Sequence, residues 1–141
     1  MNEKAETSGK TYASFEDFWP DYVRAHTNKT NRQLHFVGST LAAACVVGGV
    51  ITRRPLLLLA APVVGYGFAW VGHFVFEKNK PASFTHPVYS LRADWVMWSK
   101  IATGTMDAEV ERYTREAAEP VEAQAPNGVS ATAAPVDATV N

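Results

Sequence analysis

The stretch LHFVGSTLAAACVVGGVITRRPLLLLAAPVVGYGFAWVGHFVFE, residues 34–77, decides the fold of this chain. It contains two apolar runs, residues 36–52 and 56–72, which carry no charged side chain and are separated by Arg-Arg-Pro at residues 53–55. Each run has 17 residues, the short end of the length that spans about 30 Å of hydrocarbon. The pattern predicts two transmembrane helices joined as an antiparallel hairpin.

A histidine stands at each outer end of this hairpin. His35 precedes Arg54 by 19 residues, and His73 follows it by 19. Because an α-helix rises about 1.5 Å per residue, an antiparallel pair that turns at Arg54 brings the two imidazoles to the same depth. The glycines and alanines of both runs allow the helices to approach closely, so we expect a tight pair.

A buried hairpin of a water-soluble domain is the alternative, since both runs contain glycine and Pro62 interrupts the second. Two uncharged runs in a chain of 141 residues leave too little other protein to cover them. Membrane insertion is therefore favoured, in the cell inner membrane or the endoplasmic reticulum depending on the source. Lysine and arginine are more numerous near the histidine end than at the turn. The positive-inside rule then puts both termini and all four histidines on the cytoplasmic side.

The outer parts of the chain differ in composition from its centre. Residues 1–11 are polar, and residues 120–141 are rich in alanine, proline, valine and threonine. We expect both to be disordered, because they lack the apolar side chains that build a core. Residues 12–119 form the predicted helical membrane domain. The expected fold class is all-α, an integral membrane helical hairpin with flanking amphipathic helices.

Helices are predicted on both sides of the hairpin. Ser14, with an acidic residue three positions on, is typical of a helix start, and aromatic residues at three- and four-residue spacing follow over residues 15–26. Residues 90–101 mix tryptophan and leucine with charged residues, which favours an amphipathic or interfacial helix. Residues 107–119 are strongly charged, so we expect a helix that is a solvated face and little else.

Charge and composition exclude several classes of function. The formal net charge is −1, whereas a nucleic-acid partner usually needs a basic patch. A single cysteine, Cys45, allows no intrachain disulfide and no cysteine-based zinc site. The sequence contains no glycine-rich phosphate loop, no HExxH zinc motif and no nucleophile elbow. It does not reveal the oligomeric state.

All four histidines of the chain fall at one end of the hairpin: His26, His35, His73 and His86. Neutral imidazole is a common ligand for iron, zinc and copper, and these four come from two separate segments that could surround one ion. Glu77 shares a helix face with His73. It could be a fifth ligand or could orient an imidazole, and Asn31 could serve in the same supporting way.

Two hypotheses of other classes stay open from the residues alone. Two histidines at one level on antiparallel helices could sandwich a haem in a bis-histidine electron-transfer protein. Alternatively, the histidines could be helix caps or interfacial polar groups of a non-catalytic membrane scaffold. A di-iron histidine-box enzyme would need more histidines than the chain has.

Four groups of residues together resemble the Mpo-like family of small membrane proteins. They are His26-x4-Asn31-x3-His35-x2-Gly38, Trp70-x2-His73-x3-Glu77-x-Asn79-x-Pro81-Ala82, His86-Pro87, and Asp94-x2-Met97-Trp98. The resemblance covers about residues 15–101. The fungal member of that family acts as an iron-dependent 2-hydroxy fatty acid dioxygenase in phytosphingosine breakdown.

The resemblance implies an Fe(II) enzyme that uses dioxygen and cleaves a long-chain 2-hydroxy fatty acid between the carboxyl carbon and the hydroxylated carbon. The product is a fatty acid one carbon shorter. The family's iron-binding, catalytic histidines carry over to His26, His35, His73 and His86.

The same resemblance gives an expectation for the substrate. Its alkyl chain would lie along the apolar hairpin within the lipid bilayer, where burial favours long chains by about 0.8 kcal/mol per methylene. Arg32, Lys80 or Arg92 would pair with the carboxylate or would anchor the protein to lipid headgroups.

Overall fold

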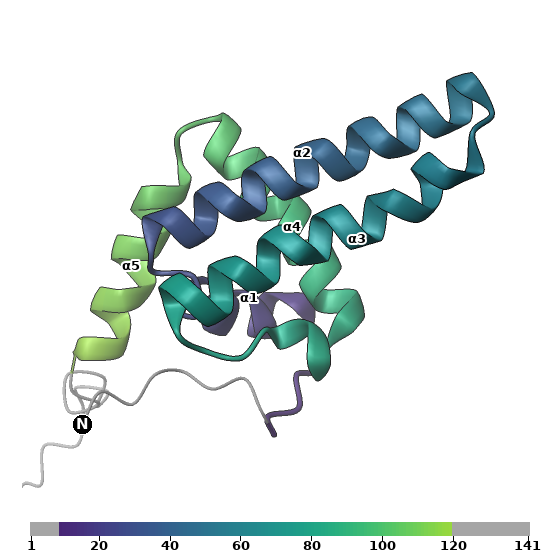
Figure 1. The fold of residues 1–141 in the computed structure, drawn as a ribbon. Coiled ribbons are helices and arrows are strands. Elements are labelled where there is room, and N and C mark those ends of the chain that lie inside the picture. Colours follow the sequence, from purple (N-terminus) through teal and green to yellow (C-terminus); the bar gives the residue numbers. More distant parts are fainter. Residues whose placement is uncertain (1–8, 120–141) are drawn as a thin grey trace, which may run out of the picture.

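The predicted hairpin is the longest feature of the fold (Figure 1). The computed structural model describes residues 9–119, and this part of the chain contains helices and no strand, which confirms the all-α prediction. In chain order the elements are α1 (Phe15–Arg24), α2 (Lys29–Thr52), α3 (Pro55–Val71), η1 (Gly72–Glu77), η2 (Ala82–Phe84), α4 (Pro87–Ala102) and α5 (Met106–Ala118). The predicted disordered tails lie outside the described residues, except for residues 9–11.

Helices α2 and α3 pack closely because glycine lies where they meet. A Cβ atom at Gly38 would lie only 2.6 Å from Cβ of Phe68, and one at Gly49 would lie 2.7 Å from Cδ2 of Leu58. Arg53 adopts the left-handed conformation, with φ 54°, and ends α2, and α3 begins two residues later. The turn is therefore as short as the sequence predicts, and the pair is tight and antiparallel.

The half of the hairpin nearest this turn projects beyond the other helices (Figure 1). Its large apolar side chains are exposed: Ile51 and Leu56 each keep 75% of their surface accessible. Both α2 and the continuous helix Pro55–Glu77 are long and apolar enough to cross a membrane. Monomeric soluble proteins rarely expose contiguous apolar patches of this kind. The structure thus has the predicted hairpin of two helices that can span a bilayer.

The histidine end of the hairpin is covered by α1, α4 and α5, which we call the cap. The N-terminus of α1 is closed by Ser14 and Asp17 in the reciprocal arrangement of a capping box, as the sequence predicts. The cap has its own core, made mainly of aromatic and methionine side chains: Phe15, Phe18, Trp19, Tyr22, Met97 and Met106. This core holds α1 and α4 over the histidine end of the hairpin.

Helix α5 is not merely the solvated face that its charges predict. The indole Nε1 of Trp19 donates to Oε2 of Glu109 at 3.0 Å, and Nη2 of Arg32 donates to Oδ1 of Asp107 at 2.7 Å. Met106 is buried. The prediction is wrong because a charge pattern along one helix does not identify partners on distant segments.

Helix α3 continues without a break into the π-helical turn η1, and such turns often occur at functional sites. One helix boundary differs from the prediction. Helix α4 begins at Pro87, three residues before the predicted start at Ser90, because proline suits the first position of a helix.

Candidate metal centre

Three of the four histidines meet beneath the cap. His26 follows α1, His35 lies in α2, and His73 lies in η1. One ring nitrogen of each lies within 4.8 Å of the other two, and the ring centroids are separated by 4.6 to 5.1 Å. All three side chains are buried. The equal spacing from the turn brings His35 and His73 level, as predicted, and the end of α1 supplies the third imidazole.

Each imidazole donates its Nδ1 proton to an oxygen atom of another residue. The three pairs are His26 Nδ1 with the carbonyl oxygen of Tyr22 at 2.6 Å, His35 Nδ1 with Oδ1 of Asp94 at 3.1 Å, and His73 Nδ1 with Oδ1 of Asn79 at 2.7 Å. Because these oxygens only accept, each Nδ1 carries a proton, and in the neutral ring Nε2 is then the nitrogen with the free lone pair. Nε2 of His26 and Nε2 of His35 are buried and have no partner among the described residues.

The environment keeps the central imidazole neutral. Burial, followed by the neighbouring imidazoles of His35 and His73, holds the pKa of His26 well below its ordinary value. An uncharged ring with a free Nε2 is the form that binds a metal ion. Three imidazole nitrogens, each ring fixed by a partner behind it, are the arrangement that transition-metal sites use. The donor set therefore fits a metal such as iron, and a bound ion would satisfy the unpaired nitrogens.

Asp94 of α4 connects the cap to this centre, a role that the sequence alone does not indicate. Its Oδ1 accepts hydrogen bonds from the hydroxyl of Tyr22 and from Nδ1 of His35. Burial, and then the charge of Asp94, raise the pKa of Tyr22 well above its ordinary value, so the hydroxyl remains a donor. The available signal was a single aspartate on a helix face that otherwise carries large apolar residues, among them Leu91, Met97 and Trp98.

Asn79 is the second residue without an assigned role in the sequence analysis. Its Nδ2 donates to the carbonyl oxygen of Ala25 at 2.9 Å, which turns Oδ1 toward His73. Lys78, with φ 58°, ends η1 in the left-handed conformation. The chain turns there, and Asn79 is the next residue. Asn79 belongs to the family-like motif, but its role depends on a contact with α1 that spacing does not reveal.

Glu77 and Asn31 lie close to the histidines but bind protein groups. The Glu77 carboxylate accepts from the hydroxyl of Thr27 at 2.8 Å, from the backbone N–H of Asn28 at 2.9 Å and from Nδ2 of Asn31 at 3.2 Å. Both residues are buried. They hold the turn between α1 and α2 against η1, and so fix His26 relative to His73. Their direct contact with a cofactor stays a prediction.

The structure does not bring His86 into the group. Its Nδ1 lies 2.9 Å from Oγ1 of Thr85, and its ring lies against the rings of Tyr12 and Phe18, at centroid distances of 5.0 and 5.8 Å. The side chain is half-buried and packs with the cap. The role of His86 as a metal ligand stays a prediction from the sequence.

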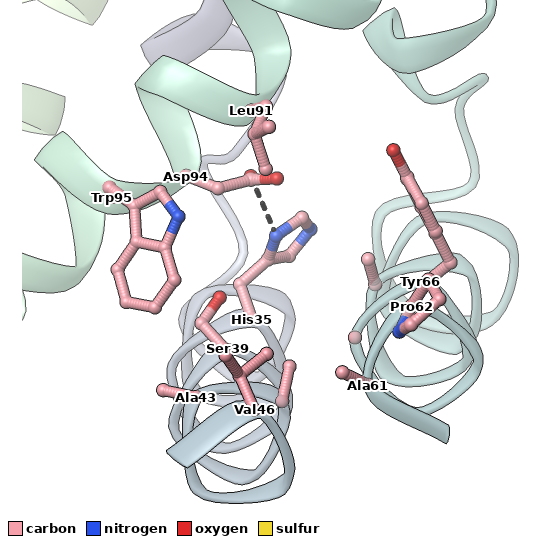
Figure 2. A pocket seen from close by; sticks show the side chains of 13 residues that line it. His35, Ser39, Ala43, Val46, Ala61, Pro62, Tyr66, Leu91, Asp94 and Trp95 are labelled. Atoms are coloured by element: carbon pink, nitrogen blue, oxygen red, sulfur yellow. Dashed lines mark hydrogen bonds and ion pairs between the residues drawn. The ribbon is translucent and has the colours of Figure 1, made fainter. Parts of the chain in front are cut away.

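A groove of about 290 Å³ begins at His35 and Asp94 and follows the hairpin (Figure 2). On α2 its wall extends from His35 to Val46, about 16 Å along a helix axis. Its lining is mostly apolar and rich in small side chains, among them Ala42, Ala43, Ala61, Gly65 and Ala69. The small residues that allow close helix packing therefore also leave space beside the histidines.

The comparison with known families agrees with this architecture. The family described as 2-hydroxy-palmitic acid dioxygenase Mpo1-like matches residues 12–106, more than half of the chain. The chain belongs to the Mpo1-like family. No curated protein and no solved structure matches it.

In this Mpo1-like protein the basic residues named above lie away from the groove or bind other groups. Nη1 of Arg32 donates to the carbonyl oxygens of His26 and Thr27. The guanidinium of Arg92 lies 4.0 Å above the ring of Phe15. Neither arginine lines the groove, and Lys80 is exposed. Their pairing with a substrate carboxylate therefore has no contact to support it.

Proposed function

We propose that this protein is an Fe(II)-dependent dioxygenase that converts long-chain 2-hydroxy fatty acids into fatty acids one carbon shorter. The reaction balances as the 2-hydroxy acid plus dioxygen giving the shorter acid, carbon dioxide and water. The observation that carries the proposal is the meeting of three buried imidazoles, each with Nδ1 bonded and Nε2 free, at the mouth of an apolar groove. Membership of the Mpo1-like family supplies the reaction class.

His26, His35 and His73 would hold the iron through Nε2. Bound Fe(II) would supply the redox chemistry that dioxygen needs and a positive charge for the substrate carboxylate. The protein's part is to fix the orientation of the three rings through the Nδ1 partners and to exclude water by burial. Three protein ligands leave coordination positions for substrate and dioxygen, as in other non-haem iron oxygenases.

The groove would bind the alkyl chain of the substrate. A chain whose head lies at the histidines would extend along the small residues of α2 and α3 toward Val46. Each buried methylene contributes roughly 0.8 kcal/mol, so the groove favours long-chain acids over short ones. No lysine or arginine of residues 9–119 lines it, which would leave a bound cation to neutralise the carboxylate.

The membrane is the natural setting for such a substrate. The exposed apolar half of the hairpin would lie in hydrocarbon, and the histidines, about 27 Å from the turn along α2, would lie near one membrane surface. Basic residues gather at that end, against Arg53 and Arg54 at the turn: Arg24, Lys29, Arg32, Lys78, Lys80, Arg92 and Lys100. This distribution supports a cytoplasmic site and cytoplasmic termini.

The position of His26 argues against the haem alternative. A bis-histidine haem needs a flat space between its two axial imidazoles, but the ring centroid of His26 lies 4.8 Å from that of His35 and 4.6 Å from that of His73. The space beside His35 and His73 is therefore filled by a third imidazole. A visible absorption spectrum of the purified protein without a Soret band would support this choice.

The test is oxygen consumption by protein purified anaerobically and loaded with Fe(II). We expect about one iron per chain, uptake of dioxygen on addition of 2-hydroxypalmitic acid, and formation of pentadecanoic acid. Palmitic acid, which lacks the hydroxyl, serves as the control and should give no uptake. A protein that retains no iron and consumes no dioxygen would be the non-catalytic scaffold instead.

The groove is tested by a matched pair of variants. Ala43 lines the groove, whereas Ala44, the next residue, does not and is exposed. Ala43→Leu should lower activity on 2-hydroxypalmitic acid and shift the preference toward shorter 2-hydroxy acids. Ala44→Leu should leave the chain-length profile unchanged. Equal profiles in both variants would place the alkyl chain elsewhere.

A further inference from the structure

Ser90, in the first turns of α4, has a hydroxyl that the fold does not use. Its side chain is only 4% exposed, and Oγ has no hydrogen-bond partner among the described residues. A buried hydroxyl left without a partner is costly and calls for a specific reason. The three imidazoles do not supply that reason, because their Nδ1 atoms form hydrogen bonds with Tyr22, Asp94 and Asn79 and not with Ser90.

Several other helical hydroxyls among the described residues bond to the backbone of their own helix. Thr40 donates to the carbonyl oxygen of Phe36 at 2.7 Å, and Thr114 donates to that of Val110 at 2.6 Å, the usual bond to the residue four positions earlier. Ser99, on the same helix as Ser90, donates to the carbonyl oxygen three positions earlier. Ser90 makes no such bond, so its hydroxyl is available to something outside the helix.

That hydroxyl belongs to a small cavity beside the histidines. Ser90 lines the cavity together with His35, His73, Tyr66 and Asp94, and the cavity holds about 20 Å³. This is room for one water-sized group. His35, Tyr66 and Asp94 also line the long groove, so the small cavity lies where the groove meets the metal centre.

The cavity offers a buried donor and an acceptor, besides the less buried hydroxyls of Ser83 and Tyr66. Ser90 Oγ–H can donate, and Asp94 can accept through Oδ2, because the bonds from Tyr22 and His35 both go to Oδ1. Within the described part of the chain no lysine or arginine lines the cavity, and the negative charge of Asp94 disfavours a carboxylate there. A neutral group that both donates and accepts, and that is the size of a water molecule, is an alcohol hydroxyl.

We infer that Ser90 binds the 2-hydroxyl group of the fatty acid and thereby selects 2-hydroxy acids over unsubstituted ones. This rests on the proposed function, since it assumes that the acid lies with its head at the histidines. The oxygen of the 2-hydroxyl accepts from Ser90, and its proton is donated to Asp94. A site that pairs its buried polar groups only with the hydroxylated ligand rejects the analogue that lacks the hydroxyl.

The test is ligand binding without turnover, by the Fe(II)-loaded protein in the absence of dioxygen. Binding is followed by tryptophan fluorescence, because Trp95 lines the groove. The wild-type protein should bind 2-hydroxypalmitic acid about tenfold or more tightly than palmitic acid. Ser90→Ala should remove most of that difference by weakening the hydroxy acid alone, and iron content should stay the same.

Two controls separate this role from a structural one. Because the Ser90 hydroxyl has no partner in the fold, Ser90→Ala should leave the melting temperature of the ligand-free protein unchanged or slightly raised. Ser99→Ala, in the same helix, should change neither binding nor selectivity. A Ser90→Ala protein that keeps the wild-type preference, or that loses both acids equally, would overturn the inference.

The outcome for the wild-type protein distinguishes this inference from the proposed reaction. A protein that prefers 2-hydroxypalmitic acid through Ser90 but consumes no dioxygen would support the hydroxyl site and overturn the dioxygenase proposal. If the wild-type protein consumes dioxygen but Ser90→Ala keeps the wild-type preference for the hydroxy acid, the dioxygenase proposal is supported and the hydroxyl site is overturned. A wild-type protein that binds neither acid would overturn both.

Discussion

The two ends of the hairpin use the same close helix contact but differ in what surrounds it. At the turn end, Leu58 packs directly against Gly49, while Ile51 is largely exposed. At the histidine end, Gly72 lies so close to Asn31 that a Cβ would be 2.1 Å from its Oδ1. There the cap buries polar side chains that lipid or water would otherwise surround. The contrast indicates that small residues allow the two helices of the hairpin to pack, whereas burial of the polar side chains at the histidines depends on the cap.

The largest expected effect is removal of an imidazole at the histidine end. His26→Ala, His35→Ala and His73→Ala should each weaken metal binding by at least about 100-fold, more than loss of a supporting residue usually costs. Arg53→Ala at the turn end should not change metal content. Metal analysis after purification checks this, and equal iron in all four variants would break the comparison between the two ends.

His86→Ala sharpens the same comparison within the histidine end. Its ring packs with the cap, apart from the other three imidazoles, so we expect this variant to retain its metal. Loss of metal in His86→Ala, with the fold intact by circular dichroism, would instead support the set of four ligands predicted from the sequence.

A smaller effect is expected for the groups behind the imidazoles. Asp94→Asn should weaken metal binding by about 10- to 100-fold, because His35 loses the carboxylate that fixes its orientation. Asp107→Asn makes the same chemical change at the exposed partner of Arg32 and should leave the affinity nearly unchanged. Titration of metal into the apo-protein measures both, and equal losses would mean that charge, not the contact with His35, matters.

The glycines test the packing at each place. Gly72→Ala would push on Asn31 and disturb its bond to Glu77, so we expect a loss of about 1–3 kcal/mol in the free energy of unfolding. A Cβ at Gly67 would meet no atom within 4 Å, and Gly67→Ala should be neutral or slightly stabilising. Thermal unfolding in detergent compares the two. A Gly72→Ala protein as stable as the wild-type protein would contradict the tight packing described for the histidine end.

The smallest effect concerns the acid stability of the cap. Burial raises the pKa of Asp21, but hydrogen bonds from Tyr12, Arg24 and Lys10 outweigh it, and the pKa is lowered overall. The folded state therefore binds this proton less readily than the unfolded state, so the stabilisation is complete above about pH 4 and is lost as pH falls through the lowered pKa.

Asp21→Asn should accordingly reduce the free energy of unfolding at pH 7 by an amount on the order of 1 kcal/mol. The difference between the variant and the wild-type protein should shrink as pH falls below about 4 and vanish once pH has fallen through the lowered pKa of Asp21. Denaturant unfolding at several pH values measures the difference, with metal content at pH 7 as the control. A difference that persists at low pH would assign the effect of Asp21 to packing and not to its charge.

The part of the fold that could be predicted from the sequence depends on distances along one helix. A helix advances by a constant rise, so two uncharged runs and a central turn were enough to predict the hairpin and to place His35 and His73 at one level. The helix start at Ser14 follows from equally local hydrogen bonds. Likewise, the family-like spacing of the histidines required no knowledge of packing.

What only the tertiary structure decided depends on contacts between segments that are distant in the chain. The convergence of His26 with the level pair, the separation of His86 and the bond from His35 to Asp94 all follow from how α1 and α4 pack over the hairpin. So do the protonated Nδ1 atoms and the unpaired hydroxyl of Ser90. Side-chain packing between helices determines these positions, and periodicity along a single helix carries no information about it.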